Sequence, residues 1–226
     1  MHQVIRNLVD RYPELENCSV DLQTAFEAMR ACFASGGKLL VCGNGGSAAD
    51  SEHLVGELMK GFASPRPVSS QLRRSLVEAH PEDGAYLADH LQGALPAIAL
   101  NSHTALGTAT ANDVAADMVF AQQVHGYGRH GDVLLGISTS GNSLNVVRAA
   151  QVARVTGLKV VGLTGAGGGR LAELCDVCVR VPFDSVSEVQ ERHLPVYHAL
   201  SLMLEQEFFP EGDTAGGAAS GARVES

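Results

Sequence analysis

The sequence predicts an α/β protein in which crossover helices connect the strands of a parallel sheet. Short β-rich apolar runs alternate with helical patterns along the chain, and this alternation is typical of strand-helix-strand units. The 226 residues, 45% of them hydrophobic, are enough to bury a full core. We therefore expect a single domain over residues 1–208.

The elements follow one another in a regular order. The predicted strands are 38–42, 96–100, 132–137, 159–163 and 176–181, and the predicted helices are 47–62, 114–128, 143–156 and 188–208. A helical region over 1–36 precedes them, with apolar residues at helical spacing at Leu22, Ala25, Phe26, Met29 and Phe33. Because no strand precedes this extra N-terminal helix, we expect it to pack on the outside or against another subunit.

Two segments depart from the alternation. Residues 64–95 contain three prolines and two helical patches, and we expect this insertion to cap one end of the sheet. Residues 209–226 are mostly small and polar, and we expect a disordered tail.

Composition excludes several classes of function. The formal net charge of −9 argues against nucleic-acid binding, because the phosphate backbone would repel an acidic surface. No apolar run is long enough to span a membrane, and the first residues lack the apolar centre of a signal peptide. The odd number of cysteines, five, does not suggest a disulfide framework. We expect a cytoplasmic protein without membrane or nucleic-acid partners.

A glycine turn follows the first strand in VCGNGGSAAD, residues 41–50. Its G-x-G-x-x-A spacing occurs in dinucleotide-binding folds, but those need an acidic residue at the end of a second strand about 20 residues later. That distance falls in KGFASPRP, which has neither acid nor strand, and the Gly-Lys-Ser/Thr element of phosphate-loop NTPases is also absent. The turn favours a small polar ligand at a helix N-terminus, with Asn44 and Ser47 adding hydrogen bonds. The alternative is a tight turn without a ligand.

A serine turn, residues 138–143, follows the third strand. Its four hydroxyls surround Gly141 and belong to Ser138, Thr139, Ser140 and Ser143. Hydroxyls and free N–H groups at a helix N-terminus can hold a phosphate without Lys or Arg. Both turns follow parallel strands and so face the same edge of the sheet, which is where open α/β sheets bind ligands.

Two pairs of polar residues have helical spacing. His53 and Glu57 are four residues apart, and Gln190 and His198 are eight apart, so each pair shares one helical face. His53 and Glu57 could present two ligands to a metal or an acid/base pair to a substrate. The alternative is that all four are solvated helix polars. His193 lies on another part of its helix and is interpreted as structural.

These segments together resemble the sugar isomerase (SIS) domain family, and within it the phosphoheptose isomerases. The segments are CGNGGSAADSEHLVGEL, AND at 111–113, GDVLLGISTSGNSLNVVRAA, LTGAGGGRLAELCDV and VQERHLPVYHAL, in the same order as in that family. The resemblance implies a flavodoxin-like, three-layer α/β/α sandwich with a five-stranded parallel sheet. It also implies a homotetramer with its sites between subunits.

The resemblance also implies roles for particular residues. The substrate would be bound by Asn44, Gly45, Gly46, Asn112, Asp113 and Gln190, and its phosphate by Ser138, Thr139, Ser140 and Ser143. A zinc ion would be held by His53, Glu57, Gln190 and His198. Glu57 and His198 are the candidates for the acid and the base.

The implied reaction converts sedoheptulose 7-phosphate to D-glycero-D-manno-heptose 7-phosphate through an enediol. Two departures leave the substrate open: the insertion at 64–95, and Ser187 where an aspartate is common in the family. One alternative is therefore an isomerase of another sugar phosphate. The others are a sugar-phosphate sensor and an adaptor resembling the replication initiator-associating protein. Such adaptors lack the residues at the positions of Glu57 and His198.

Overall fold

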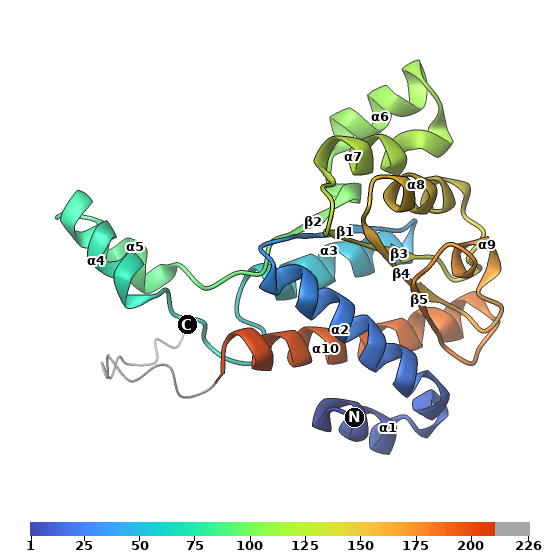
Figure 1. Ribbon diagram of the computed structural model, residues 1–226, viewed down its shortest axis with the longest axis horizontal. Coiled ribbons are helices and arrows are strands. Elements are labelled where there is room, and N and C mark those ends of the chain that lie inside the picture. The colour runs from blue at the N-terminus through green and yellow to red at the C-terminus, as the bar shows by residue number, and fades with distance from the viewer. Residues whose placement is uncertain (211–226) are drawn as a thin grey trace, which may run out of the picture.

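A five-stranded parallel sheet lies at the centre of the molecule (Figure 1). The structure is a computed structural model and describes residues 1–210. The strands are β1 (Leu39–Cys42), β2 (Ala97–Ala99), β3 (Val133–Ile137), β4 (Lys159–Thr164) and β5 (Val177–Arg180). They lie in the order β2-β1-β3-β4-β5, and all neighbours pair in parallel. All five predicted strands are confirmed.

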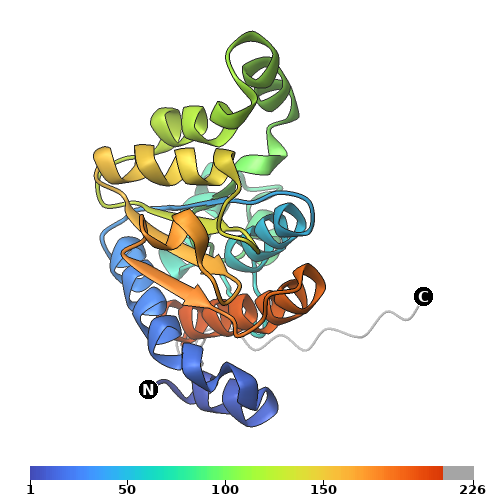
Figure 2. The same ribbon diagram turned by 90° about the vertical axis from the view of Figure 1, so that its right-hand side faces the viewer.

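Helices cover both faces of the sheet, because the strands of a parallel sheet carry apolar side chains on both faces. On β1, Leu39 and Val41 belong to one apolar cluster, and Leu40 and Cys42 belong to the other. The first cluster joins the sheet to α1, α2, α3 and α10, and the second joins it to α7, α8 and α9 (Figures 1 and 2). The predicted three-layer α/β/α sandwich is therefore confirmed.

The helices have the following bounds. They are α1 (Gln3–Arg11), α2 (Ser19–Ala34), α3 (Gly46–Met59), α4 (Ser70–Ala79), α5 (Gly84–His90), α6 (Thr104–Asp113), α7 (Val119–Tyr127), α8 (Leu144–Val155), α9 (Gly169–Ala172) and α10 (Val186–Phe208). Short 3-10 turns occur at Pro13–Cys18, Leu100–Ser102 and Ala116–Met118.

The N-terminal helix α2 packs on the outside of the sheet, which is the first of the two placements expected. Its stripe of Leu22, Ala25, Phe26, Met29 and Phe33 is buried in the same cluster as α10 and the sheet. The apolar face of α2 is thus covered by its own chain and does not by itself indicate a subunit interface.

The segment before β3 differs from the prediction. A single helix was expected over 114–128. The structure has the shorter α7 within that range, and α6, which was not predicted, before it. α6 (Thr104–Asp113) buries only Thr110 and includes Gly107 and three threonines. Without an apolar stripe and with residues of modest helix propensity, this helix gives no periodic signal in the sequence.

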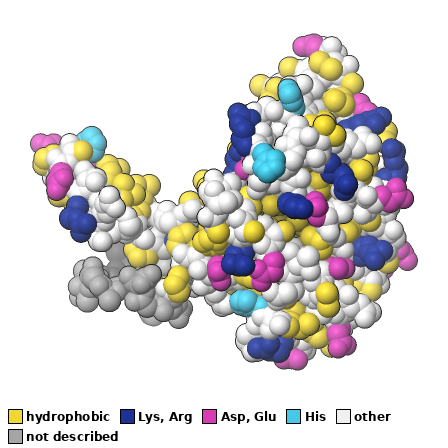
Figure 3. All heavy atoms as spheres, viewed as in Figure 1, with side chains coloured by type: hydrophobic (Ala, Val, Ile, Leu, Met, Phe, Trp, Pro, Cys, Tyr) yellow, Lys and Arg dark blue, Asp and Glu magenta, His cyan; other side chains and the backbone are white. Residues whose placement is uncertain are grey.

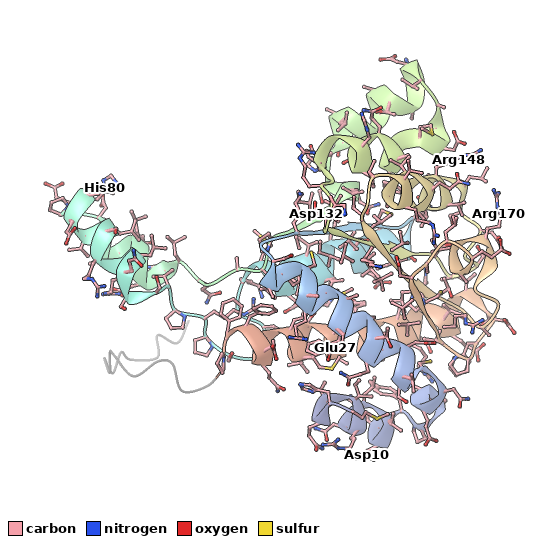
Figure 4. The ribbon with its side chains drawn as sticks, viewed as in Figure 1. Asp10, Glu27, His80, Asp132, Arg148 and Arg170 are labelled. Carbon is pink, nitrogen blue, oxygen red and sulfur yellow. The ribbon has the colours of Figure 1, made fainter. Side chains whose placement is uncertain are left out.

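The insertion forms a helical hairpin, here called the arm, made of α4 and α5. The arm projects away from the sheet, with His80 near its free end (Figures 1 and 4). At its base, Pro67 forms an antiparallel bridge with Gln92, and no residue of α4 is buried. The expectation that the insertion caps the sheet is therefore wrong, because α4 packs on α5 and the two helices project away from the sheet. Hydrophobic side chains stay exposed along the arm (Figure 3), at Leu72, Val77, Tyr86, Leu87 and Leu91.

Most of the predicted disordered tail, residues 211–226, lies outside the described residues. Phe209 is described and packs on the body, with its ring 4.7 Å from the guanidinium of Arg66. Among residues 1–210, none of the helices combines the length and the apolar composition that crossing a bilayer requires.

Candidate functional site

The glycine turn and the serine turn lie side by side where the strand order reverses. β1 lies between β2 and β3, so the chain leaves β1 toward one side and reaches β3 on the other. Such a switch point opens a crevice at the carboxyl ends of the strands. Two reciprocal amide hydrogen bonds of 2.9 Å, between Asn44 and Asn145, join the turns. The two turns therefore form one site, and Asn145 is a member that sequence reasoning missed.

Two glycines allow the N-terminus of α3 to reach this crevice. Gly45 precedes the helix with φ 56° and ψ −120°, a conformation that side chains disfavour. A Cβ at Gly46 would collide with the side-chain amide of Gln190 from α10. The first N–H groups of α3 thus lie beside Gln190, at a helix end that favours a polar or anionic ligand.

The serine turn presents hydroxyls at the N-terminus of α8. Ser138 is buried and donates through Oγ to Ser143 Oγ at 3.2 Å. Ser143 is the residue that precedes α8, yet its side chain makes no capping hydrogen bond, so its hydroxyl remains available to a ligand. These hydroxyls and the first N–H groups of the 12-residue α8 make a site suited to phosphate.

Most of the predicted binding residues line one cavity of about 280 Å³ between the two turns. The lining residues are Asn44, Gly45, Gly46, Ser47, Ile137, Ser138, Thr139, Ser143, Val186 and Gln190. The lining includes no Lys or Arg side chain. Ile137 and Val186 were not predicted, since an apolar residue beside a turn gives no chemical signal in sequence.

Three predicted binding residues lie outside this cavity. Ser140 is exposed, and its Oγ accepts a hydrogen bond from the Asn142 N–H at 3.2 Å. Asn112 and Asp113 lie at the exposed end of α6, where Asn112 donates to Asp113 Oδ1 at 2.8 Å.

A second group of polar side chains lies farther along the line where α3 and α10 pack on each other, here called the groove. The two helices run side by side in the same direction, because Gly46 faces Gln190 and His53 faces Tyr197 and His198. His53 Nε2 is 3.1 Å from Glu57 Oε1, and the His53 and His198 rings are 5.1 Å apart between centroids. The side chain of Glu57 is 11% exposed and that of His53 is 45% exposed. The structure thus brings together His53, Glu57 and His198, here called the His-Glu cluster.

Tyr197 and Asp50 support the cluster, and sequence reasoning missed both. The Tyr197 hydroxyl donates to Asp50 Oδ1 at 3.3 Å and lies 3.0 Å from His53 Nδ1. These contacts orient the His53 ring so that Nδ1 faces the Tyr197 hydroxyl and Nε2 faces Glu57 Oε1.

Burial also changes the acid-base properties of the groups around the cluster. It lowers the pKa of His198, and the charge of the neighbouring His53 lowers it further, while Glu57 acts in the opposite direction. Burial likewise raises the pKa of Tyr197, with the charge of Asp50 as the next cause. At neutral pH His198 is therefore a neutral imidazole, able to donate or accept one proton.

His193, on the same helix, is confirmed as a structural residue. It is fully buried, and burial lowers its pKa to about 4, with the Thr164 backbone acting in the opposite direction.

Because unfolded histidine titrates near 6.5, the folded protein binds fewer protons than the unfolded chain between about pH 6.5 and 4. We expect His193 to lower the free energy of unfolding by about 3 kcal/mol as pH falls through this range. Urea unfolding of wild type and His193→Gln at several pH values measures this contribution. The variant should lose less stability on acidification, whereas equal losses in both proteins would contradict the assignment.

The side chains of the His-Glu cluster are of types that bind zinc. Glu57 Oε2 and His198 Nε2 are buried and have no hydrogen-bond partner, and imidazole and carboxylate are both zinc ligands. Within residues 1–210, however, no three His, Cys, Asp or Glu side chains form a ready-made metal centre. Gln190, the fourth predicted ligand, lies at Gly46 instead. The cluster fits zinc in donor chemistry, and side-chain rotation would be needed to direct its members at one ion.

Comparison with known proteins supports the resemblance seen in the sequence. The profile of the SIS domain matches residues 3–81 and 87–165, more than half of the chain. The chain belongs to the SIS domain family. Within this family, the phosphoheptose isomerase of Rhodospirillum rubrum is 40% identical over 196 residues, 87% of this chain and 90% of that protein.

Solved structures of phosphoheptose isomerases are similar to this chain. The phosphoheptose isomerase of Neisseria gonorrhoeae superposes with a TM-score of 0.65 at 32% identity, covering 88% of this chain and 98% of its own. The phosphoheptose isomerase of Francisella tularensis superposes with a TM-score of 0.69 at 31% identity, covering 89% of this chain and 94% of its own. The chain therefore lies in the phosphoheptose isomerase group of the SIS domain family.

Proposed function

We infer that this protein is an aldose-ketose isomerase that converts sedoheptulose 7-phosphate to D-glycero-D-manno-heptose 7-phosphate. The observation that carries the inference is the placement of two sites along one groove. A cavity suited to phosphate lies at one end of α3, and the His-Glu cluster lies along the same helix. The 40% identity to a phosphoheptose isomerase over most of the chain supports the same activity.

The groove suggests how the substrate is oriented. His53 is seven positions beyond Gly46, which is about 10 Å along a helix. A phosphate in the serine turn would place the far end of an open-chain sugar near Glu57 and His198. The reacting carbons of a 7-phosphate, C1 and C2, are at that far end.

Isomerisation moves a proton from C1 of the ketose to C2 of the aldose through an enediol, and it moves a proton between the two oxygens. Glu57 is suited to be the base at carbon, because its Oε2 is buried and accepts no hydrogen bond, with the Lys60 ammonium 3.9 Å away. When His198 holds no metal, its neutral ring can donate a hydrogen bond from Nε2 to the oxygen on which negative charge develops, whereas a ring nitrogen bound to zinc has no N–H to donate. The adaptor alternative is less consistent with this arrangement, since it needs neither side chain.

We propose that His53, Glu57 and His198 also bind zinc, with Gln190 turning from the glycine turn to complete the set. When bound, the ion would polarise the substrate oxygens as a Lewis acid. A carboxylate that holds a metal is a weaker base, so Glu57 would alternate between the two roles or keep one oxygen for each. Titration calorimetry of wild type and His53→Ala with zinc tests the binding. Equal affinity in both proteins would contradict it.

Removal of the Ser143 hydroxyl should weaken binding of the sugar phosphate. We expect Ser143→Ala to lose about 1.5 to 3 kcal/mol of binding free energy, the usual value of a hydrogen bond to a charged group. Ser140→Ala should have a smaller effect, because its hydroxyl lies outside the cavity. Titration calorimetry measures the affinities, and Ser75→Ala on the exposed face of the arm is the control. Unchanged affinity in Ser143→Ala would place the phosphate elsewhere.

We further propose that the protein is a homotetramer with sites between subunits, as the family resemblance implies. The exposed apolar residues of the arm support an assembly, because isolated domains rarely leave such a surface uncovered. The exposed Asn112 and Asp113 would reach the site of a neighbouring subunit. A monomer in light scattering at micromolar concentration would contradict the proposal. The cytoplasmic location stays a prediction.

The substrate is tested by comparing ketose phosphates of different chain length. We expect the highest kcat/KM for sedoheptulose 7-phosphate among ketose phosphates with five to seven carbons. A higher value for a shorter sugar would keep the isomerase chemistry and assign the enzyme to another sugar phosphate. No turnover of any of them would favour a sensor.

A further inference from the structure

A buried ion pair lies at the base of the arm, apart from the groove residues. Arg66 Nε is 2.8 Å from Glu205 Oε1, and the two side chains are 0% and 3% exposed. Arg66 belongs to the segment that leads from α3 into the arm, and Glu205 lies near the end of α10. A buried pair is retained only where further hydrogen bonds satisfy its remaining atoms, so its other partners indicate its purpose.

The Glu205 carboxylate holds the chain that leaves α3. It accepts hydrogen bonds from three consecutive backbone N–H groups: Phe62 at 2.8 Å, Ala63 at 2.8 Å and Ser64 at 3.2 Å. Burial acts to raise the pKa of Glu205, but the N–H groups of Phe62 and Ala63 and the Arg66 guanidinium outweigh it and keep the pKa below its ordinary value. Glu205 is therefore charged at neutral pH and fixes the path of this segment.

The Arg66 guanidinium binds the end of α3 itself. It donates to the carbonyl of Leu58 at 2.8 Å and to the carbonyl of Glu57 at 3.0 Å. These carbonyls are in the last turn of the helix, where no intrahelical partner is available. The planar guanidinium makes all of these bonds at once and is covered by the Phe209 ring, 4.7 Å away.

Both members of the pair therefore touch the neighbours of catalytic groups. Arg66 holds the backbone of Glu57, and Glu205 holds the backbone of Phe62, whose ring lies 5.2 Å from the His198 ring. Glu205 is also two turns beyond His198 on α10. The pair thus connects Glu57 to His198 through a series of contacts that includes the segment after α3.

We propose that Arg66 and Glu205 are positioning residues that set the placement of Glu57 relative to His198. The proposal rests on the proposed isomerase function. Neither side chain reaches the substrate, so both act through other residues. A displacement of about 1 Å at a catalytic group can lower a rate by about a hundredfold.

The test compares Glu205→Gln with a matched variant, Asp132→Asn. Asp132 is likewise a buried carboxylate, and it accepts from the backbone N–H groups of Lys38 at 2.9 Å and Arg129 at 2.8 Å and from Lys38 Nζ at 2.5 Å. It directly precedes β3, at the amino ends of the strands and away from the groove (Figure 4). Each variant replaces one carboxylate oxygen with an NH2 group, which converts the carboxylate to an amide and leaves the side-chain size nearly unchanged.

We expect Glu205→Gln to lower kcat for sedoheptulose 7-phosphate by about tenfold to a hundredfold with KM nearly unchanged. Hydrogen exchange at the amides of residues 62–64 should accelerate. Asp132→Asn should lose comparable stability in urea unfolding yet keep a wild-type kcat. If both variants lose kcat equally, or if Glu205→Gln keeps it, the role is structural and the proposal is wrong.

A second variant covers the case in which Glu205→Gln does not fold. Arg66→Lys keeps the charge but cannot reach Glu205 and two carbonyls together, so it should also lower kcat with KM unchanged. A wild-type kcat in Arg66→Lys would overturn the proposal. A wild type that does not isomerise sedoheptulose 7-phosphate is a different result, which would refute the proposed function itself and the positioning role with it.

Discussion

Glu57→Gln should lower kcat for sedoheptulose 7-phosphate by roughly a thousandfold, the scale of a lost general base. The amide has the size of the carboxylate and can still bond to His53, so the fold should be retained, but it cannot take a proton from C1. A coupled assay of aldose phosphate formation gives the rate, and circular dichroism confirms the fold.

The matched control for this variant is Glu52→Gln. Glu52 lies on the same helix, is exposed, and accepts a hydrogen bond from Ser102 at 3.2 Å. We expect its variant to keep a wild-type rate. Near-normal turnover by Glu57→Gln would show that this carboxylate is a structural helix residue, and another base would have to be sought.

His198→Ala should lower kcat by about a hundredfold or more, because the variant loses the donor that stabilises charge on the substrate oxygen. KM for the sugar phosphate should change little, since the phosphate cavity lies at the other end of the groove. His80→Ala, near the tip of the arm (Figure 4), removes an exposed imidazole and should leave the rate unchanged. A raised KM with an unchanged kcat in His198→Ala would assign this residue to substrate binding.

The strands could be predicted because their signal is local. Runs such as Leu39 to Cys42 are apolar on both faces, and a parallel sheet covered by helices requires this pattern. α6 could not be predicted, because only Thr110 is buried and nothing periodic marks its residues. The direction of the arm was also beyond the sequence, since two amphipathic helices can pack on a sheet or on each other.

The candidate site also has residues that could be placed from the sequence and residues that could not. The cavity follows from turns that come after parallel strands, so Asn44, Ser138 and Ser143 could be placed near one another from the sequence alone. The four-residue spacing put His53 and Glu57 on one face, and the structure confirms their contact at 3.1 Å.

The supporting residues of the site could not be found from the sequence. Tyr197 and Arg66 depend on contacts with residues far away in the chain, and Arg66 and Glu205 are 139 positions apart. A buried polar side chain of this kind has no local pattern, because what explains it is a partner that only the folded chain supplies.

The most direct measurement is the position of deuterium in the product formed in deuterated water. An enediol mechanism in which Glu57 carries the proton allows exchange with solvent between its removal from C1 and its return to C2. We expect NMR to show deuterium at C2 of the heptose 7-phosphate formed from sedoheptulose 7-phosphate, and none with Glu57→Gln. An unlabelled aldose phosphate would show that the proton passes from C1 to C2 without exchange with solvent. Failure both to form an aldose phosphate and to exchange a C1 proton, in a folded protein supplied with zinc, would contradict the assignment of this groove as an isomerase active site.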